Sequence, residues 1–82
     1  MIPRIREVKA LDNSILYVMF DDGKKVHYDV SGDIKEIESY RILQTEYNLF
    51  RNVQLDQSRT VVYWNDEIDL PSDIIYEYGV EI

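Results

Sequence analysis

A small α+β domain is the fold class that this sequence predicts: an antiparallel β-sheet of about five to six strands, opening with an N-terminal β-meander, and two to three short helices. The first half of the chain indicates the sheet, because apolar residues recur at strand spacing on both sides of an Asp-Asp-Gly turn. After residue 30 the apolar spacing becomes helical. The chain has 82 residues and no Pro-, Gly- or Ser-rich linker, so we expect a single domain over residues 1–82.

The first three predicted strands form the meander. Residues 4–11 are a weak strand candidate. Residues 15–20 are apolar on both faces, which is typical of a central strand covered by helices on one side and by a partner or long side chains on the other. Val26, Tyr28 and Val30 then alternate with polar residues, so this strand is expected to have one solvent-exposed face.

The turn at residues 21–23 leaves two hairpin registers open, both of which use the positive φ that glycine adopts readily. A two-residue turn would pair Tyr17 and Met19 with the apolar residues of the next strand. A type I turn with a glycine bulge would instead bring three other residues to that face: Leu16, Val18 and Phe20. We prefer the bulged turn because it turns the bulkiest purely apolar residues toward the buried side.

Two short helices are predicted in the middle of the chain. Ser31 or Asp33 is expected to cap the first helix, which carries Ile34 and Ile37 on one face and ends near residue 39. The second helix is expected to start with Thr45 as its N-cap. Three residues follow Thr45 at helical spacing: Tyr47, Leu49 and Phe50.

The last third of the chain predicts three further strands and a closing helix. The strands are expected at residues 53–55, 60–64 and 68–70, separated by polar turns. Residues 71–73 then start a helix that ends at Gly79. The residues expected on the inward side of this helix are Ile74, Ile75 and Tyr78.

Four segments, taken in their order along the chain, together carry a family resemblance. They are Ile2-Pro3-Arg4-Ile5, the hairpin from Leu16 to Gly23 with Val26, Tyr28, Asp29 and Val30 after it, the stretch from Thr60 to Leu70, and the tail Pro71-Ser72-Asp73 with Ile75-Tyr76-Glu77. In this order they resemble the DUF2442 family, a domain of unknown function. The resemblance covers nearly the whole chain and implies a small α+β fold in a bacterial, cytoplasmic protein without an established activity. The family usually has Gly where this chain has Glu67, and its Pro falls one residue later than Pro71, so we expect a differently shaped turn here.

The charge and composition exclude several classes of function. The net charge is −7, which repels nucleic-acid phosphates and anionic lipid, so we expect no direct nucleic-acid binding. The longest apolar run, residues 15–20, is far shorter than a membrane span, and the N-terminus lacks a signal-peptide core. The chain has no cysteine, which suits a reducing cytoplasm. We therefore expect a cytoplasmic protein with no membrane segment.

No catalytic, cofactor-binding or metal-binding constellation is expected. His27 lies two residues from Asp29 and could be oriented by it as a general base, but no nucleophile is evident beside them. A group of acidic residues surrounds the predicted turn at Asp66: Asp66, Glu67, Asp69 and Asp73. Their spacing lacks the central Gly and terminal Glu of a calcium loop. An enzyme or ligand-binding domain that uses His27 and Asp29, or the acidic turn, is therefore the alternative prediction.

The aromatic residues favour an interaction protein instead. The chain has seven Tyr and one Trp, more than so small a core is expected to hold with every polar tip satisfied. Tyr63 and Trp64 are adjacent on a strand and point to opposite faces, so one is expected near the surface. Together with Tyr17 and Arg59 they form the predicted interaction surface, and the equally weighted alternative is that helices cover both faces of the sheet. We expect a non-enzymatic protein that binds a protein partner or a second copy of itself, or an antitoxin-like acidic partner of a neighbouring basic protein.

Overall fold

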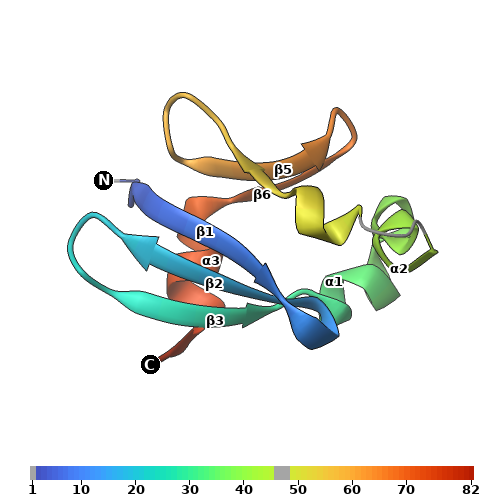
Figure 1. The fold of residues 1–82 in the computed structure, drawn as a ribbon, viewed down its shortest axis with the longest axis horizontal. Coiled ribbons are helices and arrows are strands. Elements are labelled where there is room, and N and C mark those ends of the chain that lie inside the picture. The colour runs from blue at the N-terminus through green and yellow to red at the C-terminus, as the bar shows by residue number, and fades with distance from the viewer. Residues whose placement is uncertain (1, 46–48) are drawn as a thin grey trace.

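The computed structural model describes residues 2–45 and 49–82 and confirms the α+β fold (Figure 1). In this described part, seven strands form two antiparallel sheets, whereas the sequence predicted one. The first sheet has the order β1-β2-β3-β7, with β1 at Ile5–Leu11, β2 at Ile15–Phe20, β3 at Lys25–Asp29 and β7 at Val80–Glu81. The second sheet has the order β4-β5-β6, with β4 at Gln54–Leu55, β5 at Val61–Asn65 and β6 at Ile68–Pro71.

Short helices connect and cover the two sheets. The α-helices are α1 at Ser31–Glu36, α2 at Ile42–Thr45 and α3 at Ser72–Tyr78, and the 3-10 turns are η1 at Asp12–Ser14, η2 at Glu38–Arg41 and η3 at Phe50–Asn52. In Figure 1, α3 lies behind the first sheet, while α1 and α2 lie at one end of the molecule. The opposite face of the first sheet, toward the viewer, has no helix in front of it.

The N-terminal meander and its bulged hairpin are confirmed. Val18 pairs with Val26 across β2 and β3, and Leu16 pairs with Tyr28, so this set of side chains faces the core. The amide of Gly23 donates to the carbonyl of Phe20 at 3.0 Å, and Gly23 has φ +92°. Three loop residues with a final positive φ are the expected geometry of a type I turn with a glycine bulge.

The C-terminal strand β7 was not predicted from the sequence. It pairs with β3 and makes β3 an internal strand: Val26 lies opposite Glu81 and His27 opposite Val80. The chain reaches this position through Gly79, which follows α3 as predicted. A Cβ atom on Gly79 would lie 2.8 Å from Cγ2 of Val26, so only glycine lets the chain pass this close to β3.

One hydrophobic core fills the space between the sheets and α3. Its fully buried members include Ile5, Leu16, Phe20, Val62 and Ile75. These residues come from both sheets and from α3, so the two sheets share one core, consistent with a single domain. In the part of the chain that the structure describes, no helix combines the length and apolar character that crossing a bilayer requires.

The structure corrects the predicted caps of the middle helices. Neither Ser31 nor Asp33 caps α1; the carboxylate of Asp29 accepts the amide hydrogen bond of Ser31 at 2.9 Å instead. The helix ends before Ile37, which is 43% exposed because the chain becomes extended at that residue. Thr45 lies within the helical residues of α2 and so is not an N-cap.

Two further helix predictions concern the segment after Thr45 and the direction of Tyr78. The predicted helix after Thr45 includes Tyr47, which lies outside the described residues, and the chain beyond it forms η3 with Phe50. Tyr78 was predicted to face inward but is 67% exposed. It occupies the last residue of α3, where the chain turns toward β7, so its ring lies beyond the part of the helix that the core covers.

Candidate functional site

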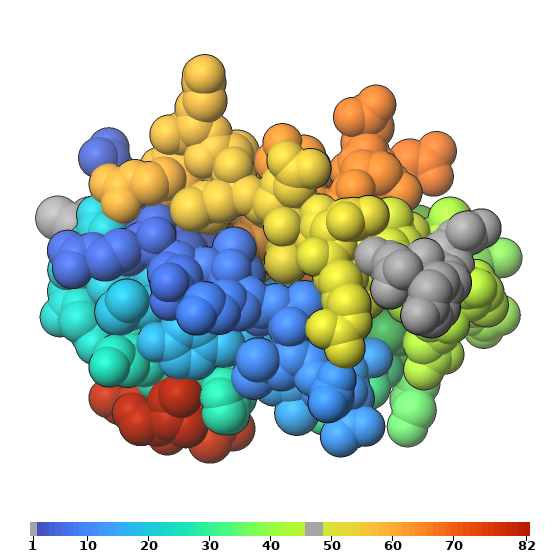
Figure 2. Space-filling model, in the orientation of Figure 1, coloured from blue at the N-terminus to red at the C-terminus, as the bar shows by residue number. Residues whose placement is uncertain are grey.

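The face of the first sheet that points away from the core is the candidate functional surface, and we call it the outer face. Strand alternation puts every second residue there, opposite the buried set of Leu16, Val18 and Phe20. The described residues that form it are Glu7, Lys9 and Leu11 of β1, Ile15, Tyr17 and Met19 of β2, Lys25, His27 and Asp29 of β3, and Val80 of β7. Figure 2 shows this side of the molecule, with β2 side chains reaching the surface between those of β1 and β3.

The outer face has an apolar centre and a charged border. Ile15, Tyr17 and Met19 run along β2, one of the two inner strands, and each is half-buried by its neighbours. Glu7 and Lys9 flank this row on β1, where a weak ion pair of 3.9 Å joins them. A central apolar row with a polar rim is the usual anatomy of a protein interface.

Tyr17 and His27 form a cross-strand pair at the middle of this face. They are register partners on β2 and β3, and their rings meet edge to face with centroids 6.3 Å apart. Lys9 lies on the other side of Tyr17 in the same row, and Val80 lies beyond His27. The pair holds the Tyr17 ring in place on an otherwise uncovered surface, which is favourable for an interface anchor.

A cavity of about 490 Å³ opens beside the outer face, where β3 meets α1, and we call it the acidic cavity. Its carboxylates are Asp29, Asp33 and Glu36. Its aromatic and aliphatic walls are His27, Tyr28, Tyr78, Ile15 and Val80. Among these described lining residues there is no Lys or Arg, so the cavity has a negative potential and walls that suit an aliphatic stem.

Hydrogen bonds fix two of these carboxylates. The hydroxyl of Tyr28 donates to Asp33 at 2.8 Å, and burial together with this hydrogen bond raises the pKa of Tyr28 far above its ordinary value. Asp29 accepts hydrogen bonds from Ser31, which lower the pKa of Asp29. The lowered pKa keeps Asp29 charged at neutral pH.

His27 and Asp29 line the same cavity, but the acidic turn lies elsewhere. Asp66 is exposed in the β5–β6 turn, where Asn65 accepts the amide hydrogen bonds of Glu67 and Ile68. Across residues 2–45 and 49–82, no three His, Asp or Glu side chains are grouped closely enough to hold a metal ion. The two candidate sites of the alternative prediction are thus separate.

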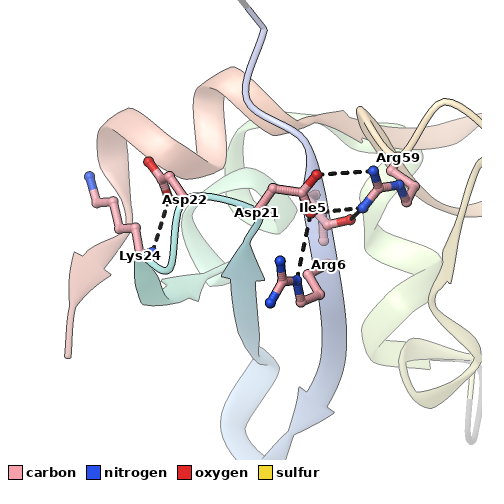
Figure 3. Close-up of polar contacts among 6 residues, drawn as sticks. All are labelled: Ile5, Arg6, Asp21, Asp22, Lys24 and Arg59. Carbon is pink, nitrogen blue, oxygen red and sulfur yellow. Dashed lines mark hydrogen bonds and ion pairs between the residues drawn. The ribbon is translucent and has the colours of Figure 1, made fainter.

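Arg59 is occupied by an internal ion pair (Figure 3). Its guanidinium donates two hydrogen bonds to Asp21, at 2.8 and 3.0 Å, and a longer one to the carbonyl of Ile5 at 3.4 Å. Arg6 approaches the same carboxylate at 3.8 Å. The hydrogen bonds from Arg59 lower the pKa of Asp21. Arg59 therefore fastens the β4–β5 loop to the first hairpin.

Trp64 belongs to the core. It is 6% exposed, its indole N–H donates to the carbonyl of Phe50 at 2.9 Å, and the two rings stack with centroids 5.8 Å apart. Tyr63, on the opposite face of β5, is half-buried, as the alternation of the strand predicts. Tyr17 and Tyr63 lie on different sheets, so Tyr17 alone of the four predicted interaction residues lies on the outer face.

A second hollow, of about 1140 Å³, lies between the N-terminal residues, the first hairpin and α3. Its polar groups already bond to one another: the hydroxyl of Tyr76 donates to Asp22 at 2.6 Å, and the Lys24 ammonium donates to the Tyr76 carbonyl at 3.0 Å. Lys24 also lies 4.0 Å from the centre of the Tyr76 ring. These contacts account for Asp22 and Lys24 structurally, so this hollow is a weaker candidate than the outer face.

Sequence reasoning missed several residues of the outer face. The sequence did indicate Met19 and Ile15, because residues 15–20 are apolar at every position. Helices were expected to cover one side of that strand, and a partner or long side chains the other side. The sequence did not indicate Val80 and Lys9, since their positions depend on how β7 and β1 pair with the central strands.

The fold and the outer face define a class: a small two-sheet α+β domain with one sheet face uncovered. The chain belongs to the DUF2442 family, described as a protein of unknown function, whose model matches residues 5–81. The match confirms the resemblance seen in the sequence and runs from the start of β1 to the end of β7. No curated protein and no solved structure matches the chain.

Proposed function

We propose that this chain is a non-enzymatic interaction protein that binds a protein partner, or a second copy of itself, through its outer face. The observation that carries the proposal is the row of Ile15, Tyr17 and Met19. These side chains lie on an inner strand of the sheet, yet no element of the described chain covers them (Figures 1 and 2). Burying such a row in a complex stabilises it by removing apolar area from water.

Exposed neighbours extend the apolar row sideways. Leu11 at the end of β1 is 37% exposed, and Val80 on β7 is 70% exposed. The charged side chains lie around this centre, where they remain solvated when the centre is covered. The proposal therefore needs no rearrangement of the sheet, since the surface is preformed.

Site-specific photo-crosslinking tests the proposal. A benzophenone amino acid at position 17 is expected to give a discrete adduct in cells, identified by mass spectrometry as one protein or as the chain itself. The matched control carries the same probe at position 63, also a half-buried tyrosine but on the other sheet. Adducts at position 63 with none at position 17 would contradict the proposal.

The acidic surface supports a finer version, in which the partner is a basic protein encoded nearby, as in an antitoxin-like role. From Asp56 to Glu81 the chain has Arg59 as its single cation, and Asp21 neutralises it. The exposed surface around β6 and α3 therefore attracts a basic protein. This version requires the partner protein to be basic and the complex to weaken as ionic strength increases.

Ligand binding at the acidic cavity is a second candidate function. His27 is half-buried and shares the cavity with Asp29, as the alternative predicted from the sequence requires. Titration with small amines, followed by the NMR shifts of the His27 ring, tests this candidate. Saturable shifts that disappear in Asp29→Asn would support it, and unchanged spectra at millimolar amine would refute it.

A further inference from the structure

We infer that the occupant of the outer face is a second copy of this chain, and that Lys9 of each copy enters the acidic cavity of the other. This inference rests on the proposed function and adds the partner, the symmetry and the contacts. Three observations lead to it: the charge of the outer face, the cross-strand register of its residues, and the position of the acidic cavity next to it.

The charge of the outer face favours a second copy. Lys9 and Lys25 carry two positive charges, and Glu7 and Asp29 carry two negative charges, so these four residues sum to zero. The whole chain has a net charge of −7. The four charged residues of this face therefore lack the negative excess of the whole chain, so an identical face meets no net repulsion from them.

The register of the strands determines which residues would meet. A two-fold axis parallel to β2 places β1 of one copy over β3 of the other, with each row opposite the same row. Lys9, Tyr17 and His27 share one row, so Lys9 of the second copy faces His27 while the two Tyr17 rings meet at the axis. In the next row, Glu7 of one copy faces Lys25 of the other.

The other in-plane axis, perpendicular to β2, gives a poorer match. It places each strand over the same strand of the second copy, so that Lys9 would face Lys9 and His27 would face His27. Like charges in direct opposition are destabilising. The charges therefore select the axis parallel to β2.

The acidic cavity then lies where Lys9 of the second copy arrives. His27, the residue opposite Lys9, lines the cavity together with Asp29, and Asp33 and Glu36 line it from α1. An ammonium group on an aliphatic stem suits three carboxylates with aromatic and aliphatic walls. Lys9 is free to move there, because its side chain is 62% exposed and its 3.9 Å ion pair with Glu7 is weak.

The size of the outer face limits the strength of the dimer. Four strands of about 4.8 Å spacing and five residues of about 3.3 Å rise cover roughly 300 Å² per copy. A stable interface buries about 800 Å² per partner, so the dimer belongs to the weak class. We expect dissociation in the range of about 10 μM to 1 mM.

Sedimentation velocity between about 10 μM and 1 mM tests the inference, with thermal unfolding of each variant as the check on folding. The wild-type chain is expected to shift toward a dimer, and Lys9→Glu to weaken association at least about tenfold. The matched control is Arg41→Glu, an identical charge change on η2 outside the outer face, expected to stay within about twofold of wild type. If Lys9→Glu unfolds, Lys9→Gln replaces it, with the same direction of effect.

A charge exchange tests the register itself. Glu7→Lys and Lys25→Glu are each expected to weaken the dimer, because each places like charges opposite one another. The double variant restores opposite charges in both contacts between residue 7 of one copy and residue 25 of the other. It is expected to recover association to within about threefold of wild type. No recovery in the double variant, or a Lys9 variant that dimerises as well as the Arg41 control, would overturn the inference.

The outcomes also separate this inference from the proposed function. A chain that stays monomeric at about 1 mM while a probe at position 17 still captures another protein excludes the second copy and leaves the proposed function standing. A monomer that also gives no adduct at position 17 refutes both.

Discussion

Replacing Gly79 by Ala tests the close approach that attaches β7 to the sheet. The added Cβ would lie 2.7 Å from the carbonyl oxygen of Ile75, and 2.8 and 2.9 Å from Cγ2 and Cβ of Val26. Comfortable carbon contacts are about 3.5–4.0 Å, so the neighbours would have to move by roughly 1 Å. Val26 is fully buried and paired on both sides within the sheet, and Ile75 contributes a backbone atom, so neither yields easily.

The expected cost of Gly79→Ala follows from two opposing effects. Overpacking a well-packed site destabilises by about 1–3 kcal/mol. Removing glycine reduces the entropy of the unfolded chain, which stabilises by about 0.4–1 kcal/mol. The net destabilisation is therefore about 1–2 kcal/mol, or roughly 5–15 °C in melting temperature for a domain of this size.

Thermal unfolding followed by circular dichroism measures this effect. Gly32→Ala is the matched control, because a Cβ there has no neighbour within 4 Å and the residue lies in α1, where alanine is favoured. Gly32→Ala is expected to raise the melting temperature and Gly79→Ala to lower it. Equal effects of the two substitutions would refute the packing account of Gly79, and with it the reason that β7 can lie beside β3.

Three further predictions concern one core hydrogen bond and two ionisable groups. Trp64→Phe keeps the stacking on Phe50 but removes the indole hydrogen bond to its carbonyl, so urea unfolding should show a loss of about 1–3 kcal/mol. The pKa of Asp21 is lowered below its ordinary 3.8, so its ion pair with Arg59 stabilises the fold above that pH. This stability is lost as the pH falls through the folded-state pKa. Between pH 2 and 5, the melting temperature should therefore change less with pH in Asp21→Asn than in wild type. Burial raises the pKa of Tyr40 to about 12, so wild-type stability should fall between pH 10 and 12 as the unfolded chain ionises, and Tyr40→Phe should reduce that fall. An unchanged slope in either pH series would show that the group concerned titrates alike in the folded and unfolded chain.

The uncovered sheet face changes how the aromatic content of this chain is interpreted. Counting aromatic residues suggested more of them than so small a core could hold, but Tyr28, Tyr40 and Trp64 are accommodated in the core. Tyr28 and Trp64 satisfy their polar atoms with Asp33 and a backbone carbonyl. The feature that remains unexplained within the chain is therefore the row through Tyr17, and not the aromatic residues as a group.

Local rules explain what the sequence predicted well. The first hairpin was predictable down to its register, because a three-residue loop ending in Gly23 and the alternation of Leu16, Val18 and Phe20 favour the same pairing. The strand at β5 and the helix that stops at Gly79 were predictable for similar reasons. In each case the residues that decide the structure lie within a few positions of one another.

Contacts between distant residues decided the rest. Whether Arg59 is free depends on Asp21, 38 positions away, and whether Trp64 is exposed depends on the path of the chain through Phe50. The pairing of β7 with β3 involves a segment of two residues, which is too short to show a strand pattern in the sequence. It also depends on the space that Gly79 leaves beside Val26. The sequence by itself therefore determined the fold class, the first hairpin and the apolar character of both faces of β2. Only the tertiary structure decided which of those faces the core covers, because burial is set by the packing of segments far apart in the chain.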